Sequence, residues 1–313
     1  MSQPLSPSDI EGLRRLPLPG LMAEALAVKL AARGDRFSLC TIINAKSGQC
    51  SENCAFCVQS AHFRTDAPVY PLKDRDEIVA AAREAKRIGS GRFSLVTSGR
   101  GPTDREVERI AAIVAAIRDE VDIPVCASLG IMNARQLRVL KQAGLSRYHH
   151  NLETSREFFP KVATTHTFDE RVATIRAARE AELEVCAGGI VGLGESEEDW
   201  ISLAITLRDL EVDSVPFNIL MPLPGTPLAH REPLAPERIL RAVALFRLIV
   251  RNGALRLCAG RESALGDLLG LAFMAGADAM MIGGYLTQRG RSPEEDLLLV
   301  KNIRTVWKTT LPG

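Results

Sequence analysis

Three cysteines at the spacing C-x3-C-x2-C are the residues of this chain most able to do chemistry. Cys50, Cys54 and Cys57 lie in "AKSGQCSENCAFCVQS" (45–60), and no fourth cysteine is close by. Three thiolates in one short loop can hold three corners of a 4Fe-4S cluster and leave the fourth iron open to a ligand from outside the protein. The alternatives are a zinc site, for which His62 is the only local fourth ligand, and three unligated thiols exposed to oxidation.

The other four cysteines each lie in or at the end of an apolar run: Cys40, Cys126, Cys186 and Cys258. A single cysteine of this kind is usually an inert small hydrophobe. Four of them on different strands could converge, because alternate side chains of barrel strands point inward. Thiolates that meet there would select an iron-sulfur cluster or another thiophilic metal.

Short runs rich in aliphatic and β-branched residues recur along the chain and predict eight strands. They are 38–44, 92–98, 123–130, 146–152, 183–192, 213–220, 255–260 and 278–284. Helical patterns lie between them, such as 103–120, where Thr103 and Glu106 can form a capping box, and the segment that begins at Ser196 with Asp199 three residues on. The alternation predicts a (β/α)8 TIM-type barrel over residues 38–313, preceded by an N-terminal helical extension over residues 1–37. In such a barrel the chemistry lies at the carboxyl ends of the strands.

Composition narrows the class of protein. The 313 residues carry 39 basic and 38 acidic side chains, so nothing indicates nucleic acid or anionic lipid as a partner. The most apolar window, 268–286, contains Asp278 and four glycines, which is not typical of a membrane span. The N-terminus lacks the pattern of a secretion signal, so we expect a cytoplasmic protein, where seven cysteines indicate metal or redox chemistry rather than disulfides.

The cysteine loop also resembles a known family. C-x3-C-x2-C with an aromatic residue, Phe56, before the last cysteine is the radical S-adenosylmethionine signature, and "CSENCAFCVQSAHF" is similar to the form found in the biotin synthase family. The resemblance continues in "GRGPTDRE", "RYHHNLETS", "TTHTFDER", "CAGGIVGLGE", "DSVPFNIL", "GTPL", "AGRE" and "FMAGAD". It implies a sulfurtransferase that makes biotin: a 5'-deoxyadenosyl radical, formed from S-adenosylmethionine at the open iron, activates dethiobiotin, which then takes sulfur from an auxiliary cluster. It further implies a homodimer and an electron donor of the flavodoxin or ferredoxin type.

The resemblance implies a set of S-adenosylmethionine contacts. Asn151 and Glu153 would approach the ribose, Arg171 the methionine carboxylate, and Phe56 and Ile190 the two faces of the adenine. The family has aspartate at the position of Glu153, a change that moves the carboxylate by one methylene. The segment "GGIVGLGE" (188–195) lacks the third glycine of a dinucleotide-binding loop and is rich in carboxylates, so we interpret it as a strand end that lets S-adenosylmethionine lie close to the backbone.

Two asparagines are the substrate residues that the resemblance implies. Asn151 and Asn218 stand at the family's dethiobiotin positions, and an amide supplies both the donors and the acceptor that a ureido ring needs. The alternative is that both amides merely satisfy backbone groups at strand ends. His149 replaces the usual asparagine beside them and leaves that corner of the pocket undefined.

The auxiliary cluster of the family is usually 2Fe-2S, bound by three cysteines and an arginine. Cys126, Cys186 and Arg261 match three of these positions, but Ser94 stands where the family has the remaining cysteine. A serine alkoxide is a harder and more basic ligand than a thiolate.

Cys40 and Cys258 stand where many relatives carry serine. We therefore expect Cys40, Cys126, Cys186 and Cys258 to form one four-thiolate site, favouring a four-iron cluster over a 2Fe-2S site that uses Ser94. Arg92 and Arg261 would then offset the charge of the cluster without binding iron.

Two other functions compete with biotin synthesis. One is another radical barrel enzyme of the same branch that inserts no sulfur, such as a maturation or rearrangement enzyme. The other is an iron-sulfur carrier without catalytic activity, which would not need the S-adenosylmethionine residues.

Overall fold

Parallel strands form a closed barrel in the computed structural model, which describes residues 5–284, 286 and 290–310. The described strands are β1 (Ser38–Lys46), β2 (Phe93–Thr97), β3 (Val125–Ser128), β4 (Leu145–His149), β5 (Glu184–Cys186), β6 (Gly189–Val191), β7 (Ser214–Ile219), β8 (Ala254–Leu257) and β9 (Ala279–Met281). Their order is β5-β4-β3-β2-β1-β9-β8-β7-β6, and pairing of β5 with β7 closes the barrel. The predicted (β/α)8 fold is confirmed, with β5 and β6 together filling one barrel position.

The fifth strand is broken because another segment of backbone crosses it. The run 183–192 was predicted as one strand, but the chain after β4 pairs with it at Glu153 and Gly189. Ile190 N–H donates to Glu153 O at 2.8 Å, and a Cβ on Gly189 would lie 2.4 Å from that same oxygen. Only glycine fits there. The crossing holds Glu153 against the strand end.

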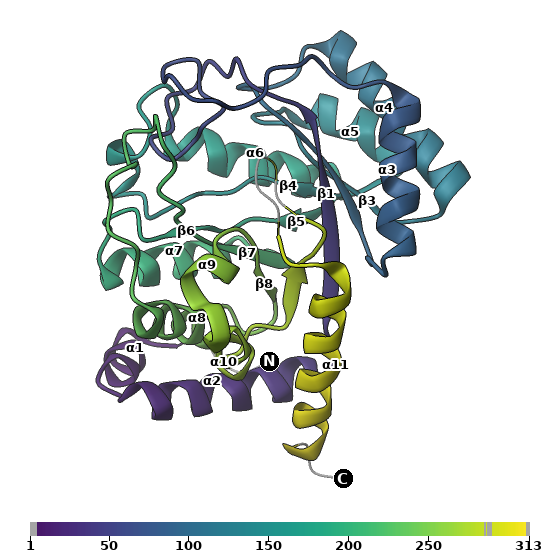
Figure 1. Cartoon of the computed structure of the whole chain (residues 1–313). Coiled ribbons are helices and arrows are strands. Elements are labelled where there is room, and N and C mark those ends of the chain that lie inside the picture. The colour runs from purple at the N-terminus through teal and green to yellow at the C-terminus, as the bar shows by residue number, and fades with distance from the viewer. Residues whose placement is uncertain (1–4, 285, 287–289, 311–313) are drawn as a thin grey trace.

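Helices surround the barrel and alternate with its strands (Figure 1). After the strands come α3 (Arg75–Arg87), α4 (Asp104–Val121), α5 (Ala134–Ala143), α6 (Phe168–Glu180), α7 (Glu197–Asp209), α8 (Pro236–Val250), α9 (Arg261–Leu265), α10 (Leu269–Met274) and α11 (Pro293–Thr310). Both predicted helix starts are confirmed as capping boxes, Thr103 with Glu106 and Ser196 with Asp199. None of the described helices is both long and apolar enough to cross a membrane.

Two helices make up the described part of the N-terminal extension, α1 (Pro7–Arg14) and α2 (Leu18–Arg33). Residues 1–4 of the expected extension and 311–313 of the expected barrel domain lie outside the described residues. Figure 1 shows α2 running below the barrel, where it packs on α8 and α10. Its buried residues are Leu21, Ala25 and Lys29. Lys29 is thus a fully buried lysine in a helix whose other buried residues are apolar.

We expect Lys29 to make stability rise with pH. Burial lowers the pKa of Lys29 to about 7, and its Nζ lies over the Trp307 ring and donates to Gly34 O at 2.7 Å. Between about pH 7.5 and 9.5 the unfolded chain binds the Lys29 proton and the folded chain does not, so Lys29 should contribute a rise of about 1.4 kcal/mol per pH unit to the free energy of unfolding. The buried thiols, whose pKa is raised, contribute in the opposite direction, so the contribution of Lys29 is read as the difference between wild type and variant. Urea unfolding of Lys29→Met across this range should lack that slope. The exposed Lys301→Met should retain it, and parallel curves for wild type and Lys29→Met would show that Lys29 stays charged when folded.

Candidate functional site

A cavity of about 380 Å³ opens at the carboxyl ends of the strands. It brings together most of the residues that the sequence singled out: Cys50, Cys54, Phe56, Cys57, His149, Asn151, Glu153, Arg171, Ile190, Asn218 and Cys258. Cys40, Cys126 and Cys186 do not line it and lie on β1, β3 and β5. The three loop cysteines and the strand cysteines therefore lie in different parts of the barrel, and Cys258 is the strand cysteine that also lines the cavity.

The three-cysteine loop is partly buried, which differs from the exposed loop expected for unligated thiols. Cys54 is buried, and Cys50 and Cys57 are half-buried. Burial raises the pKa of Cys54 to about 12, against the opposing charge of Arg171, and raises that of Cys57 to about 11. Thiolates here therefore require positive charge, which iron and the Arg171 guanidinium can supply.

Three thiols in one loop are the donors that a 4Fe-4S cluster takes from a protein. Throughout the described residues, no group of three or more His, Cys, Asp or Glu side chains is arranged to hold one metal ion. The thiolates of a cluster bind different irons and need not converge on one point. The loop therefore fits the 4Fe-4S cluster that its spacing predicts.

Three polar residues next to the loop form one connected group. Arg171 Nη1 donates to Asn151 O at 2.7 Å and lies 3.4 Å from Glu153 Oε1, and its Nη2 lies 4.0 Å from Cys54 Sγ. Asn151 Nδ2 donates to Glu153 at 3.3 Å. Burial raises the pKa of Glu153, although the charge of Arg171 opposes this. The structure thus places Asn151, Glu153 and Arg171 together beside Cys54.

Phe56 and Ile190 also lie together. Both pack against a small apolar cluster of Val162, Leu193 and Leu220, separate from the main core. Both line the cavity. This arrangement gives the cavity one apolar side suited to a flat aromatic ring.

Both asparagines bond to backbone, as the alternative interpretation expects, yet both keep unused hydrogen-bonding capacity. Asn218 Nδ2 donates to Gly189 O at 3.1 Å and its Oδ1 accepts from Ala259 N at 3.2 Å, which uses two of its four bonds. The Oδ1 of Asn151 accepts from Gly188 N at 3.1 Å and lies 2.9 Å from His149 Nε2. His149 therefore helps to orient the Asn151 amide.

The barrel interior holds the other thiols around an arginine. Burial raises the pKa of Cys126. It also raises the pKa of Cys186 to about 11 and the pKa of Cys258 well above the usual range of a thiol. Ser94 is the strand partner of Cys126, and its buried Oγ has no hydrogen-bond partner among the described residues. An unsatisfied hydroxyl beside soft thiols fits a site that takes an inorganic group.

Arg256 and Arg147 are two arginines near the interior thiols that the sequence did not single out, and the charge of Arg147 acts on Cys126 and Cys186. Arg256 is the one whose pKa responds to all four thiols. Burial lowers its pKa, but the thiols of Cys40, Cys186, Cys258 and Cys126 outweigh that effect and raise it. The signal was present, because residues 256 and 258 of one strand must face the same side.

Arg261, the arginine chosen from the resemblance, lies instead at the start of α9. Its guanidinium pairs with Glu262 and with Asp296, each at 2.6 Å. Its charge acts to lower the pKa of Cys258, although burial and the neighbouring thiols raise it overall.

A parallel barrel with a three-cysteine loop at the carboxyl ends of its strands defines a radical S-adenosylmethionine enzyme. Residues 46–207 match the model of the radical SAM superfamily, and residues 216–303 match the Biotin and Thiamin Synthesis associated domain. A crystal structure of methylornithine synthase has a TM-score of 0.83 at 21% identity, covering 99% of this chain and 98% of that one. The FeFe-hydrogenase maturase from Carboxydothermus hydrogenoformans has a TM-score of 0.78 at 20% identity, covering 94% and 77%. Identities this low show a common fold alone.

The particular family follows from closer relatives. The biotin synthase of Pelotomaculum thermopropionicum is 50% identical over 293 residues, covering 94% of this chain and 91% of the relative. That of Geotalea daltonii is 49% identical over 296 residues, covering 94% and 90%. The chain belongs to the biotin synthase family, which confirms the resemblance seen in the sequence.

Proposed function

We infer that this enzyme converts dethiobiotin to biotin by radical insertion of sulfur. The observation that carries this inference is the single cavity, which joins the three-cysteine loop, the Asn151–Glu153–Arg171 group, Asn218 and the thiol of Cys258. A substrate in this cavity can contact the S-adenosylmethionine residues and the sulfur-bearing interior at once. A radical reacts with what lies nearest, so this positioning is the main catalytic task of the protein.

At the open end of the cavity, Cys50, Cys54 and Cys57 would hold the 4Fe-4S cluster. When bound, this cluster and S-adenosylmethionine supply the electron and the adenosyl radical that removes hydrogen from dethiobiotin. Arg171 would bind the methionine carboxylate, and Asn151 and Glu153 would bind the ribose. Phe56 and Ile190, which pack on the apolar cluster of Val162, Leu193 and Leu220, would bind the adenine.

Cys40, Cys126, Cys186 and Cys258 would hold the auxiliary cluster, and the four-iron type is favoured. The charge of Arg256 acts on all four thiols and would offset theirs. Arg147 acts on Cys126 and Cys186, Arg92 acts on Cys126 as well, and Arg261 acts on Cys258. The orphaned Ser94 hydroxyl would face the cluster as a hydrogen-bond donor rather than as an iron ligand.

On the family pattern we further propose a homodimer in the cytoplasm, reduced by a flavodoxin or ferredoxin type of protein. We also propose that residues 38–313 form a single barrel domain that carries both clusters and follows the N-terminal extension, residues 1–37.

Turnover with and without dethiobiotin tests the function. Reduced, reconstituted enzyme should form biotin and should consume S-adenosylmethionine rapidly only when dethiobiotin is present. Asn218→Ala should raise the KM for dethiobiotin by roughly 10-fold, because one neutral hydrogen bond contributes about 1 kcal/mol and a buried unpaired partner costs more. The affinity for S-adenosylmethionine should change far less, since Asn218 is proposed to face the ureido ring.

Other outcomes point to the other functions. Rapid S-adenosylmethionine cleavage with a different substrate and no biotin would indicate an enzyme that inserts no sulfur. No cleavage under any condition would indicate a carrier. Equal losses of affinity for both ligands in Asn218→Ala would contradict the placement of Asn218.

A further inference from the structure

A buried histidine lies between a carboxylate and the arginine of the cofactor site. His166 Nδ1 is 2.5 Å from Glu52 Oε2, and its Nε2 is 2.9 Å from Arg171 Nε. The His166 side chain is 2% exposed. It lies between β4 and α6, just before Thr167, whose capping box with Glu170 begins α6. Its two ring nitrogens therefore connect the cysteine loop to Arg171.

The hydrogen-bond directions fix the state of this imidazole. Arg171 Nε–H can only donate, so His166 Nε2 must accept. The proton then lies on Nδ1 and is donated to Glu52, which leaves a neutral ring with one tautomer. His166 gives Arg171 an acceptor that carries no charge.

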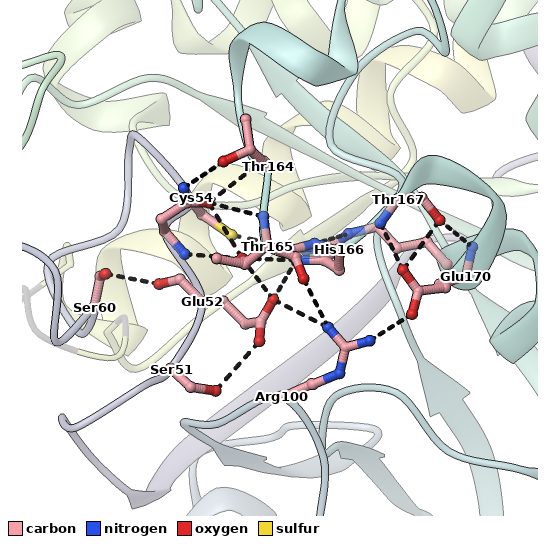
Figure 2. Close-up of polar contacts among 12 residues, drawn as sticks. Ser51, Glu52, Cys54, Ser60, Arg100, Thr164, Thr165, His166, Thr167 and Glu170 are labelled. Atoms are coloured by element: carbon pink, nitrogen blue, oxygen red, sulfur yellow. Dashed lines mark hydrogen bonds and ion pairs between the residues drawn. The ribbon is translucent and has the colours of Figure 1, made fainter.

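Residues 164–167, which include His166, also hydrogen-bond directly to the cysteine loop. Figure 2 shows residues 164–167 lying beside Glu52, with Arg100 reaching both Glu52 and Glu170. Thr165 Oγ1 donates to Glu52 Oε2 at 2.7 Å, and the Asn53 amide oxygen accepts from Thr164 N at 2.9 Å. Glu52 is thus a fixed anchor rather than a mobile side chain.

We propose that His166 is a positioning residue that holds the Arg171 guanidinium beside Cys54 without adding a second carboxylate to the one that Glu153 already presents to it. A carboxylate in the place of His166 would pair with the guanidinium and offset the charge that the anionic thiolates and the methionine carboxylate of S-adenosylmethionine require. A neutral imidazole fixes the direction of Arg171 at no such cost, and Glu52 fixes the imidazole. The proposal rests on the proposed function only in that Arg171 faces bound S-adenosylmethionine.

Substituting glutamine or leucine for His166 tests whether its hydrogen bonds position Arg171 or whether its side chain only fills space in the core. A glutamine amide can accept from Arg171 and donate to Glu52, whereas leucine can do neither. The variants are made in a Cys126→Ala/Cys186→Ala background, so that the three-cysteine cluster alone gives the electron paramagnetic resonance (EPR) signal. Affinity for S-adenosylmethionine is read from the change in that signal on titration. This readout does not depend on biotin formation or on the type of auxiliary cluster.

We expect His166→Leu to weaken S-adenosylmethionine binding by roughly 10- to 100-fold, the usual cost of losing a residue that orients a metal-site group. His166→Gln should stay within about threefold of the parent, since both bonds are kept. Both proteins should keep four irons per chain. An unchanged affinity in His166→Leu, or a loss in His166→Gln as large as that in His166→Leu, would overturn the proposal.

A double-mutant cycle tests whether His166 acts through Arg171. Arg171→Lys keeps the charge but lacks the Nε–H that bonds to His166. In that background His166→Leu should weaken S-adenosylmethionine binding by less than about threefold, because the effects of two coupled residues on affinity do not add. Full additivity would mean that His166 acts by another route. If His166→Leu assembles no cluster, His166→Gln decides alone: full iron with near-parent affinity supports the proposal, and weak binding refutes it.

Discussion

Replacing Cys54 by alanine should abolish formation of 5'-deoxyadenosine, with or without dethiobiotin. With two thiolates left, the loop cannot hold the cluster whose open iron binds S-adenosylmethionine. Anaerobically reconstituted Cys54→Ala should lack the irons of this cluster and keep those of the auxiliary site. Product is measured by chromatography, and iron is measured by colorimetric assay.

The fold should survive this change. Cys54 is 8% exposed and belongs to the main core, so its loss should cost about 1 kcal/mol and leave the circular dichroism spectrum unchanged. The apo forms of wild type and variant provide the matched comparison. Normal 5'-deoxyadenosine formation by a folded Cys54→Ala protein would refute the cluster assignment.

The auxiliary site should hold four irons rather than two. Wild-type protein reconstituted without oxygen should contain roughly eight irons per chain, against roughly six for a 4Fe-4S and 2Fe-2S pair. Cys40→Ala and Cys258→Ala should each deplete the auxiliary irons and stop biotin formation. Both should keep the three-cysteine cluster and some cleavage of S-adenosylmethionine, because those residues lie in a separate loop. A fully ligated four-iron core must still give up sulfur, so we expect an additional labile sulfide or one weakly held corner.

Ser94→Ala is the matched control for the auxiliary site. It should keep all the auxiliary irons if four thiolates bind them, since the Ser94 hydroxyl is then only a hydrogen-bond donor. It should lose them if Ser94 is a ligand. Full iron content and normal biotin formation in both Cys40→Ala and Cys258→Ala would make these cysteines ordinary buried residues, and a two-iron site with Ser94 or an arginine would replace the four-thiolate proposal.

Local pattern was sufficient for much of the fold and for the cysteine loop. The strand runs, the capping boxes at Thr103 and Ser196, and the spacing of Cys50, Cys54 and Cys57 each depend on residues within one turn or one strand. Alternation along a strand also indicated that the other cysteines face inward. These features are encoded over a few residues, so the sequence determined them by itself.

The other features of the site depend on contacts that form only when the barrel closes. The break between β5 and β6 exists because the backbone of Glu153 crosses at Gly189, and Arg256 rather than Arg261 lies among the interior thiols because strand position places it there. Glu52 and His166 are 114 residues apart in sequence, and nothing near either one predicts their hydrogen bond. Such contacts depend on which side chains the closed barrel brings to one end and on how each polar group finds a partner once water is excluded.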